Sequence, residues 1–181
     1  MDIRKISIVG SGTLGIMYGR FLSRHLPAGS VRFVADENLI ETYKNTPITC
    51  NGTPCDFTFI PFGTDDPADL VIFAMRFGEL DDVIRRIGSQ VGKNTVILSL
   101  INGITSQDML SRAFGNDRVL LCTVQGMDVS RTGNDITYTD MGILNIGTHD
   151  GLPTDFIKML TSFFDSAGFP YNLSTDMLSR A

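Results

Sequence analysis

The sequence predicts an α/β protein of the Rossmann type, with a doubly wound, mostly parallel sheet and an added antiparallel hairpin. Short apolar segments typical of buried strands alternate with amphipathic segments of helical period. A glycine-rich turn joins the first such strand to the first such helix. The chain has 181 residues, 43% of them hydrophobic, which is enough for one domain with a sizeable core.

The first half of the chain contains two strand–helix units and a hairpin. Residues 3–9 are expected to form a buried strand, and apolar side chains then recur at positions 14, 17, 18, 21 and 22, which make one helix face. Arg20, Ser23 and Arg24 fall on the other face of that helix. The elements that follow are a strand at 31–35, a short helix at 38–44 and a hairpin at 47–60 around Asn51-Gly52.

The second half continues the alternation and then changes character. Buried strands are expected at 70–74 and 95–101, with helices at about 80–87 and 105–114. Residues 118–125 and 136–147 resemble paired strands around a polar turn at 130–134, which would extend the sheet in antiparallel fashion. A helix with an apolar face from Phe156 to Phe164, a short strand at 169–173 and a helix N-cap at Ser174-Thr175-Asp176 complete the pattern.

Composition and charge exclude several classes of protein. The net charge of −5 and the lack of a Lys/Arg run give no footprint for nucleic acid. No segment reaches about 18 uninterrupted apolar residues, and the N-terminus lacks the features of a signal peptide, so we expect a cytoplasmic protein without a membrane partner. The three cysteines do not form a disulfide framework, and Cys50 and Cys55 are expected to be reduced strand residues without a metal.

The glycine turn Gly10-Ser11-Gly12-Thr13-Leu14-Gly15 predicts a dinucleotide site. It follows a buried strand and opens an amphipathic helix, whose first N–H groups favour phosphate. Gly10 permits the tight turn, Gly12 lets the backbone approach a pyrophosphate, and Gly15 allows close helix–strand packing. A β-branched residue at Gly12 is therefore expected to abolish binding with little loss of fold. The alternative is a bend that needs glycine for packing only.

Asp36 lies 21 positions after Gly15, at the end of the next strand. A carboxylate there accepts hydrogen bonds from ribose hydroxyls and repels a 2′-phosphate, which favours NAD(H) at least as much as NADP(H). The alternative is that Asp36 caps the helix at 38–44. The two roles are compatible.

The chain resembles the N-terminal domain of the ketopantoate reductase (2-dehydropantoate 2-reductase) family. The residues that carry the resemblance are "KISIVGSGTLG", "DLVIFAMRFGELDDVI", "SLINGI", "RVLLCTVQGMDVSRTGNDITYTDMGILNIG" and "STDMLSRA". The glycine motif is shared by many dehydrogenases, whereas Arg76, Asn102-Gly103 and the later hairpin are more selective. The resemblance implies a dinucleotide-binding domain at 1–173. It also implies that residues 174–181 are the start of the helix that leads into a helical second domain, which this sequence is expected to lack.

The resemblance also implies roles for individual residues. The family reduces a 2-keto acid, 2-dehydropantoate, to pantoate with hydride from NADPH, so a small-molecule 2-keto acid is the expected substrate and a homodimer is a possible assembly. Residues 10–15 would hold the pyrophosphate, and Arg76 would lie near the adenosine end of the cofactor. Asn102, with Gly103 after it, would orient the substrate carbonyl and the nicotinamide ribose. The alternatives are a solvated arginine after a strand and a simple Asn-Gly turn.

Two departures from the family pattern affect these expectations. Asp36 stands where the family has an arginine for the 2′-phosphate, so the cofactor can be NADP or NAD. The family's general-acid lysine belongs to the helical domain, and the chain is therefore expected to bind cofactor without turnover. The alternatives are another two-domain NAD(P)-dependent hydroxy-acid dehydrogenase and a nucleotide-sensing Rossmann domain without chemistry.

Overall fold

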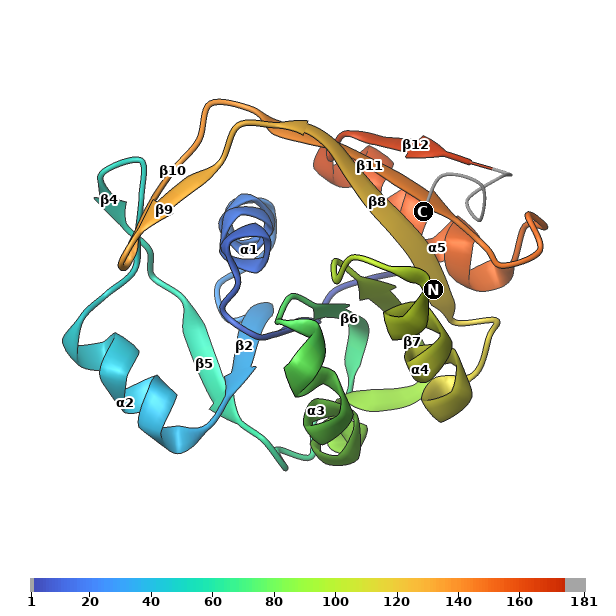
Figure 1. Ribbon diagram of the computed structural model, residues 1–181, viewed down its shortest axis with the longest axis horizontal. Helices are drawn as coiled ribbons and strands as arrows, with labels where there is room; N and C mark the ends of the chain where they lie inside the picture. The colour runs from blue at the N-terminus through green and yellow to red at the C-terminus, as the bar shows by residue number, and fades with distance from the viewer. Residues whose placement is uncertain (1, 175–181) are drawn as a thin grey trace.

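The computed structural model describes residues 2–174 and has the predicted α/β architecture. Its main sheet has eight strands in the order β12-β11-β8-β7-β6-β1-β2-β5 (Figure 1). The strands from β8 to β5 in that order are parallel, whereas β11 pairs antiparallel with β8 and carries β12 parallel to itself. The bounds are β1 Ile6–Val9, β2 Val31–Ala35, β5 Thr58–Pro61, β6 Ala68–Phe73, β7 Val91–Ser99, β8 Val119–Met127, β11 Met141–Gly147 and β12 Tyr171–Leu173.

Helices cover both faces of this sheet, as a doubly wound fold requires. They are α1 Thr13–His25, α2 Glu37–Asn45, α3 Leu80–Arg86, α4 Ile104–Phe114 and α5 Asp155–Ala167, with short 3₁₀ turns η1 Phe77–Glu79 and η2 Gly88–Gln90. Buried residues of α1 and α5 share one apolar cluster with Ile6 and Ile8. Residues of α3 and α4 share a second cluster with Val9 and Val71. Both predicted ends of α5 are confirmed: Thr154 caps its N-terminus, and Gly168 ends it in the left-handed conformation.

The hairpin expected at 47–60 is shorter than predicted, and residues beyond it join the main sheet. Asn51 (φ 51°) and Gly52 (φ 77°) form the turn between β3 Thr49–Cys50 and β4 Thr53–Pro54. Strand β5 then pairs with β2 at the sheet edge. The polar turn at 130–134 is likewise more than a turn, because β9 Ser130–Thr132 and β10 Asp135–Thr137 form a second sheet in the order β4-β3-β10-β9. This sheet arches over α1 (Figure 1).

The second sheet changes the environment of one α1 side chain. Arg20, expected on the polar face of the helix with Ser23 and Arg24, is only 9% exposed. The β3–β4 hairpin covers it, and its guanidinium donates to the carbonyl of Thr53. Helical periodicity alone could not show this, because the covering strands come about 30 residues later in the sequence.

A second arginine is buried on the sheet itself. Arg32 of β2 donates to the side chains of Ser7 and Gln90 and to the carbonyl of Asp66, and it forms an ion pair with the Asp66 carboxylate. Lys5 and Arg32 both hydrogen-bond to Asp66, and these contacts hold the pKa of its carboxyl below the usual range. The network ties β1, β2 and the segment before β6 together.

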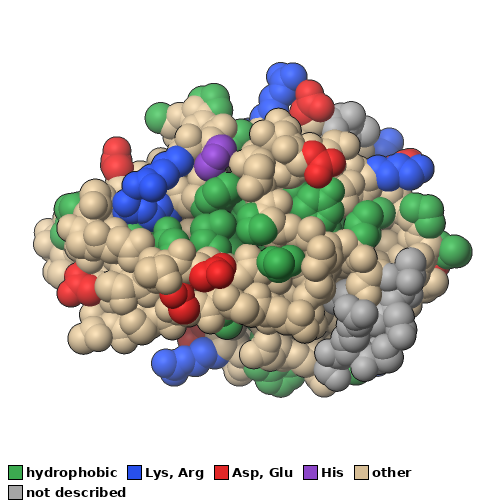
Figure 2. All heavy atoms as spheres, turned by 90° about the horizontal axis from the view of Figure 1, so that it is seen from above, with side chains coloured by type: hydrophobic (Ala, Val, Ile, Leu, Met, Phe, Trp, Pro, Cys, Tyr) green, Lys and Arg blue, Asp and Glu red, His purple; other side chains and the backbone are tan. Residues whose placement is uncertain are grey.

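None of the helices among residues 2–174 is long and apolar enough to cross a bilayer. Figure 2 shows one face of the molecule, where hydrophobic side chains form a band across the middle and charged side chains lie around it. Lys and Arg side chains on this face are dispersed rather than gathered into one patch. The helix start expected at Thr175-Asp176 lies outside the described residues.

Candidate functional site

The strand ends bring the predicted site residues to one edge of the sheet. Val9, Phe73 and Ser99 lie in register across β1, β6 and β7, and Val9 is also in register with Val34 of β2. The loops that follow these four strands therefore meet at the carboxyl edge. The strand order reverses between β1 and β6, which is where such sheets bind their ligands.

The glycine turn is packed tightly against the end of β6. Gly10 has a φ of 91°, and the N–H of Gly12 donates to the Ala74 carbonyl at 3.1 Å. A Cβ added at Gly10 or Gly12 would lie 2.6 Å from that carbonyl oxygen. The expectation that a side chain at Gly12 would leave the fold largely intact is therefore wrong. At Gly15 an added Cβ would lie 2.6 Å from the Ala74 Cβ, in agreement with the packing role expected for this glycine.

The N-terminus of α1 has the chemistry of an anion site. Gly12 occupies the N-cap position, no side chain caps the helix, and its first turn contains no acidic residue. The N–H groups of Thr13 and Leu14, at the start of this 13-residue helix, thus have no side-chain acceptor and carry the positive end of its dipole. This donor set fits a pyrophosphate.

Two side chains from distant segments hold Ser11 in the turn. The Tyr43 hydroxyl of α2 donates to the Ser11 Oγ at 2.9 Å, and Arg131 of β9 donates through Nη1 to the Ser11 carbonyl at 2.6 Å. Sequence reasoning missed both residues, because nothing near Tyr43 or Arg131 in the sequence indicates contact with the glycine turn. Through Arg131 the second sheet is anchored to the candidate phosphate site.

A cavity of about 440 Å³ extends from the glycine turn along the ends of β1 and β2. Gly10 and Ser11 line it beside the turn, and its charged lining residues are Asp36, Glu79, Asp82 and Arg86. Its apolar lining comprises Val9, Phe33, Val34, Ala35, Leu39, Tyr43, Phe59, Phe62, Met75 and Val83. An apolar slot with phosphate donors at one end and a carboxylate at the other fits the adenosine half of a dinucleotide.

Asp36 is paired with a cation that the sequence did not reveal. Arg86 of α3 forms an ion pair with the Asp36 carboxylate, donates to Asp82 at 3.1 Å, and stacks over the Phe62 ring at 4.1 Å. Asp36 also occupies the N-cap position of α2, but its side chain makes no capping hydrogen bond. Asp36 therefore stands at the helix-cap position, as the alternative expects, but its carboxylate contacts Arg86 instead of capping the helix.

Arg76 and Asn102 lie at the same sheet edge but outside the lining of this cavity. Arg76 is exposed at the N-cap of η1 and makes no ion pair with any residue that the structure describes. Asn102 is exposed after β7, and its side chain has no hydrogen-bond partner within residues 2–174. Gly103 has a φ of 101° and is the N-cap of α4, so the Asn-Gly pair also forms the turn that starts this helix.

Comparison with known proteins gives consistent relatives. Residues 6–151 match the family model described as ketopantoate reductase PanE/ApbA. The chain is 26% identical over 187 residues to the 2-dehydropantoate 2-reductase of Aquifex aeolicus (strain VF5), covering 97% of this chain and 57% of that protein.

Solved structures share the fold. A 2-dehydropantoate 2-reductase from Geobacter metallireducens GS-15 superposes with a TM-score of 0.78 at 23% identity, over 97% of this chain and 59% of that one. D-mandelate dehydrogenase with NADH and anilino(oxo)acetate gives 0.81 at 17% identity, over 96% and 58%. The chain thus spans less than two thirds of these relatives' lengths. Because the family model covers most of its residues, the chain belongs to the ketopantoate reductase PanE/ApbA family.

Proposed function

We propose that this chain binds NAD(H) or NADP(H) and forms the cofactor-binding part of an oxidoreductase that reduces a 2-keto acid, with 2-dehydropantoate as the substrate and pantoate as the product. The observation that carries the proposal is the cavity between the uncapped N-terminus of α1 and the Asp36–Arg86 pair. Phosphate donors, an apolar slot and groups for the adenosine ribose follow one another along it, as dinucleotide binding needs.

Each part of the cavity has a distinct task in this proposal. The amides of Thr13 and Leu14 hold the pyrophosphate, and Tyr43 and Arg131 keep Ser11 and the turn in place. The Asp36 carboxylate accepts from the ribose hydroxyls, while the Arg86 guanidinium reaches a 2′-phosphate if one is present. Phe62 and Leu39 shield the adenine from water.

Asn102 acts at the other end of the site. Its amide both donates and accepts, so it can hold the substrate carbonyl and the nicotinamide ribose in a fixed relation. The bound nicotinamide supplies the hydride, and the keto oxygen takes up a proton. The proposal assigns none of the described lysines as the donor of that proton. A homodimer is part of the proposal as well, since a ketopantoate reductase from Staphylococcus aureus is described as dimeric.

Titration of the chain with NADH and NADPH, followed by calorimetry, tests the proposal. We expect saturable binding of one dinucleotide per chain, weakened by adenosine diphosphate competing for the same cavity. Absence of binding at millimolar cofactor would refute it. A panel of 2-keto acids added to the cofactor complex distinguishes substrates, because tighter binding of an aromatic keto acid than of 2-dehydropantoate would favour a different hydroxy-acid dehydrogenase.

A further inference from the structure

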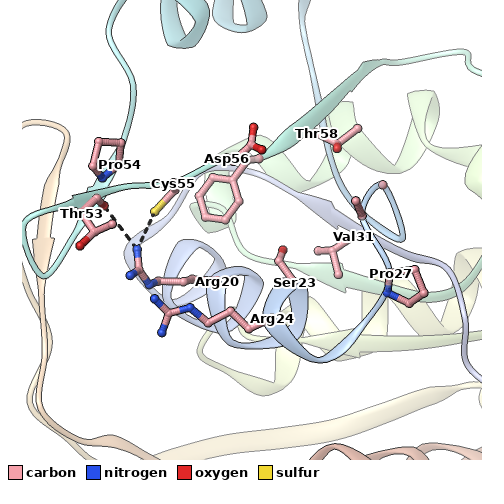
Figure 3. Close-up of a pocket in the computed structure, with 13 residues that line it drawn as sticks. Arg20, Ser23, Arg24, Pro27, Val31, Thr53, Pro54, Cys55, Asp56 and Thr58 are labelled. Atoms are coloured by element: carbon pink, nitrogen blue, oxygen red, sulfur yellow. Dashed lines mark hydrogen bonds between the residues drawn. The ribbon is translucent and has the colours of Figure 1, made fainter.

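A second cavity, of about 360 Å³, lies between the later turns of α1 and the β3–β4 hairpin, away from the dinucleotide cavity (Figure 3). Arg20, Ser23 and Arg24 of α1 form one wall, and Cys55 and Asp56, which follow β4, form part of the other. Cys55 is partly exposed in this cavity, so a small molecule can reach its sulfur. The sequence predicts a strand residue at this position, whereas Cys55 lies just after the end of β4.

The Arg20 guanidinium is directed at the Cys55 sulfur. Its Nη1 donates to the Cys55 Sγ at 3.4 Å and to the Thr53 carbonyl at 3.3 Å (Figure 3). Arg20 is buried and has no carboxylate partner within residues 2–174. A buried guanidinium without a carboxylate favours an anion beside it, and a thiolate at Cys55 would supply one.

Cys50 lies on the same face of the hairpin as Cys55. The N–H of Cys55 donates to the Ile48 carbonyl at 2.8 Å, so Cys55 lies opposite Ile48. Cys50 is two residues from Ile48 and therefore projects to the same side. The Cys50 thiol is fully buried and lies close enough to Cys55 to influence its ionisation.

These contacts polarise the two thiols in opposite directions. Hydrogen bonding from Cys50, and then from Arg20, lowers the pKa of Cys55 to about 6, with the Arg24 charge acting in the same sense. Hydrogen bonding to Cys55 and burial raise the pKa of Cys50, which stays a protonated donor. Asp56 and Tyr138 are titratable groups beside this pair, and Tyr43 and Lys44 of α2 line an adjoining pocket with Cys55. An accessible thiolate next to a protonated thiol is the arrangement of a redox-active pair.

We propose that Cys55 is a hydroperoxide-reactive thiolate and that Cys50 resolves its oxidised form into a Cys50–Cys55 disulfide. The Cys55 sulfur attacks one peroxide oxygen, the O–O bond breaks, and the leaving hydroxide or alkoxide takes a proton from water. The sulfur is oxidised to sulfenic acid as the peroxide is reduced. The Cys50 sulfur then attacks the Cys55 sulfur, the S–OH bond breaks, and the hydroxide leaves with the Cys50 proton as water. A dithiol reductant reverses the product.

Hydrogen peroxide treatment at neutral pH, followed by thiol counting and peptide mass analysis, tests this assignment. We expect the wild-type chain to lose two of its three free thiols and to yield a Cys50–Cys55 linked peptide. Cys50→Ser should instead accumulate a Cys55 sulfenic acid that dimedone traps, and Cys55→Ser should retain its thiols. Cys122→Ser is the matched control, because burial raises the pKa of Cys122 to about 12 and its removal should leave the reaction unchanged.

The pH dependence of alkylation distinguishes a Cys55 thiolate from an exposed cysteine of ordinary pKa. The rate of Cys55 alkylation should reach half its maximum near pH 6 in the wild-type chain, and that midpoint should rise in Arg24→Gln, an exposed position that does not contact the sulfur. The proposal would be overturned if the Cys55→Ser variant lost thiols to peroxide as fast as the wild type. It would also be overturned if the wild-type chain kept all three thiols after peroxide treatment. A stable sulfenic acid without disulfide would overturn the role of Cys50.

Discussion

Arg86→Gln is the substitution that best tests how the adenosine end of the cavity distinguishes the two cofactors. Arg86 is held by Asp36, Asp82 and the Phe62 ring, at the point where a 2′-phosphate would lie beside the Asp36 carboxylate. Removing the guanidinium takes away a cation and at the same time leaves the Asp36 carboxylate without its counter-charge. Both changes oppose a 2′-phosphate, whereas neither removes an acceptor for the ribose hydroxyls. The variant should therefore weaken NADP(H) binding selectively.

The expected size of the effect follows from charge and exposure. Two unit charges about 4 Å apart interact by about 1 kcal/mol in water and about 4 kcal/mol near a protein surface. The side chains of Asp36 and Arg86 are 59% and 37% exposed, so solvent screening places the effect in the lower part of this range. A loss of about 1 to 2 kcal/mol corresponds to a roughly 5- to 30-fold increase in the Kd for NADP(H). The Kd for NAD(H) should change by less than about threefold, since it has no 2′-phosphate.

Calorimetric titration of both cofactors, reduced and oxidised, into the wild type and the variant measures this selectivity. Arg85→Gln is the matched control, because Arg85 is the neighbouring arginine of α3, pairs with Asp81 and at 3.7 Å with Asp82 but not with Asp36, and is 64% exposed. It should leave both affinities unchanged. An equal loss for NAD(H) and NADP(H) in Arg86→Gln would mean that Arg86 only supports the fold of the site, and unchanged NADP(H) affinity would refute the assignment.

Four further predictions concern Asp36, the turn, the substrate end and the sheet network. Asp36→Arg should shift the preference toward NADP(H), from a wild type that binds NAD(H) at least as tightly; parallel Kd measurements check both points. Gly12→Val should abolish binding and lower stability by about 1 to 3 kcal/mol through its contact with the Ala74 carbonyl, as a thermal melt would show. Asn102→Ala should leave the melting temperature unchanged and weaken 2-keto acid binding to the cofactor complex about fivefold, the effect of one hydrogen bond. The pKa of Asp66 is lowered in the folded state, so its contribution to the free energy of unfolding is present above about pH 4 and is lost as the pH falls through the folded-state pKa. Asp66→Asn should therefore reduce the pH dependence of the free energy of unfolding, measured with urea, in that acid range.

The regular part of the fold was accessible from the sequence because each element there is defined by its own residues. The strands Ile6–Val9 and Val31–Ala35 are buried throughout and apolar except for Ser7 and Arg32, and α5 has an apolar stripe, a threonine cap and a closing glycine. The short strands were not accessible. Strands such as β9 and β10 have three residues each and no apolar period, and they are defined by pairing with each other and, for β10, with the distant strand β3.

The same distinction explains which parts of the site were predicted. The glycine turn and Asp36 follow directly from strands, so their place at the carboxyl edge could be inferred from local pattern. Arg86 meets Asp36 across 50 residues, and its only local signal is Asp82 one helical turn earlier, which indicates nothing more than a surface pair on α3.

The cation beside Asp36 is Arg86 and not Arg76, which the family resemblance places near the adenosine end of the cofactor. Arg76 is exposed and away from the cavity lining, so it does not offset the carboxylate directly, whereas Arg86 is in contact with it. If the proposed function holds, the balance between NAD(H) and NADP(H) depends on the Asp36–Arg86 ion pair. With Arg86 on Asp36, the carboxylate is partly neutralised and less available to the ribose hydroxyls; with Arg86 turned to a 2′-phosphate, the remaining Asp36 and Glu37 charges oppose that phosphate. Because each arrangement sacrifices a favourable contact, the preference for either cofactor should be modest, and single substitutions at Asp36 or Arg86 should move it in opposite directions.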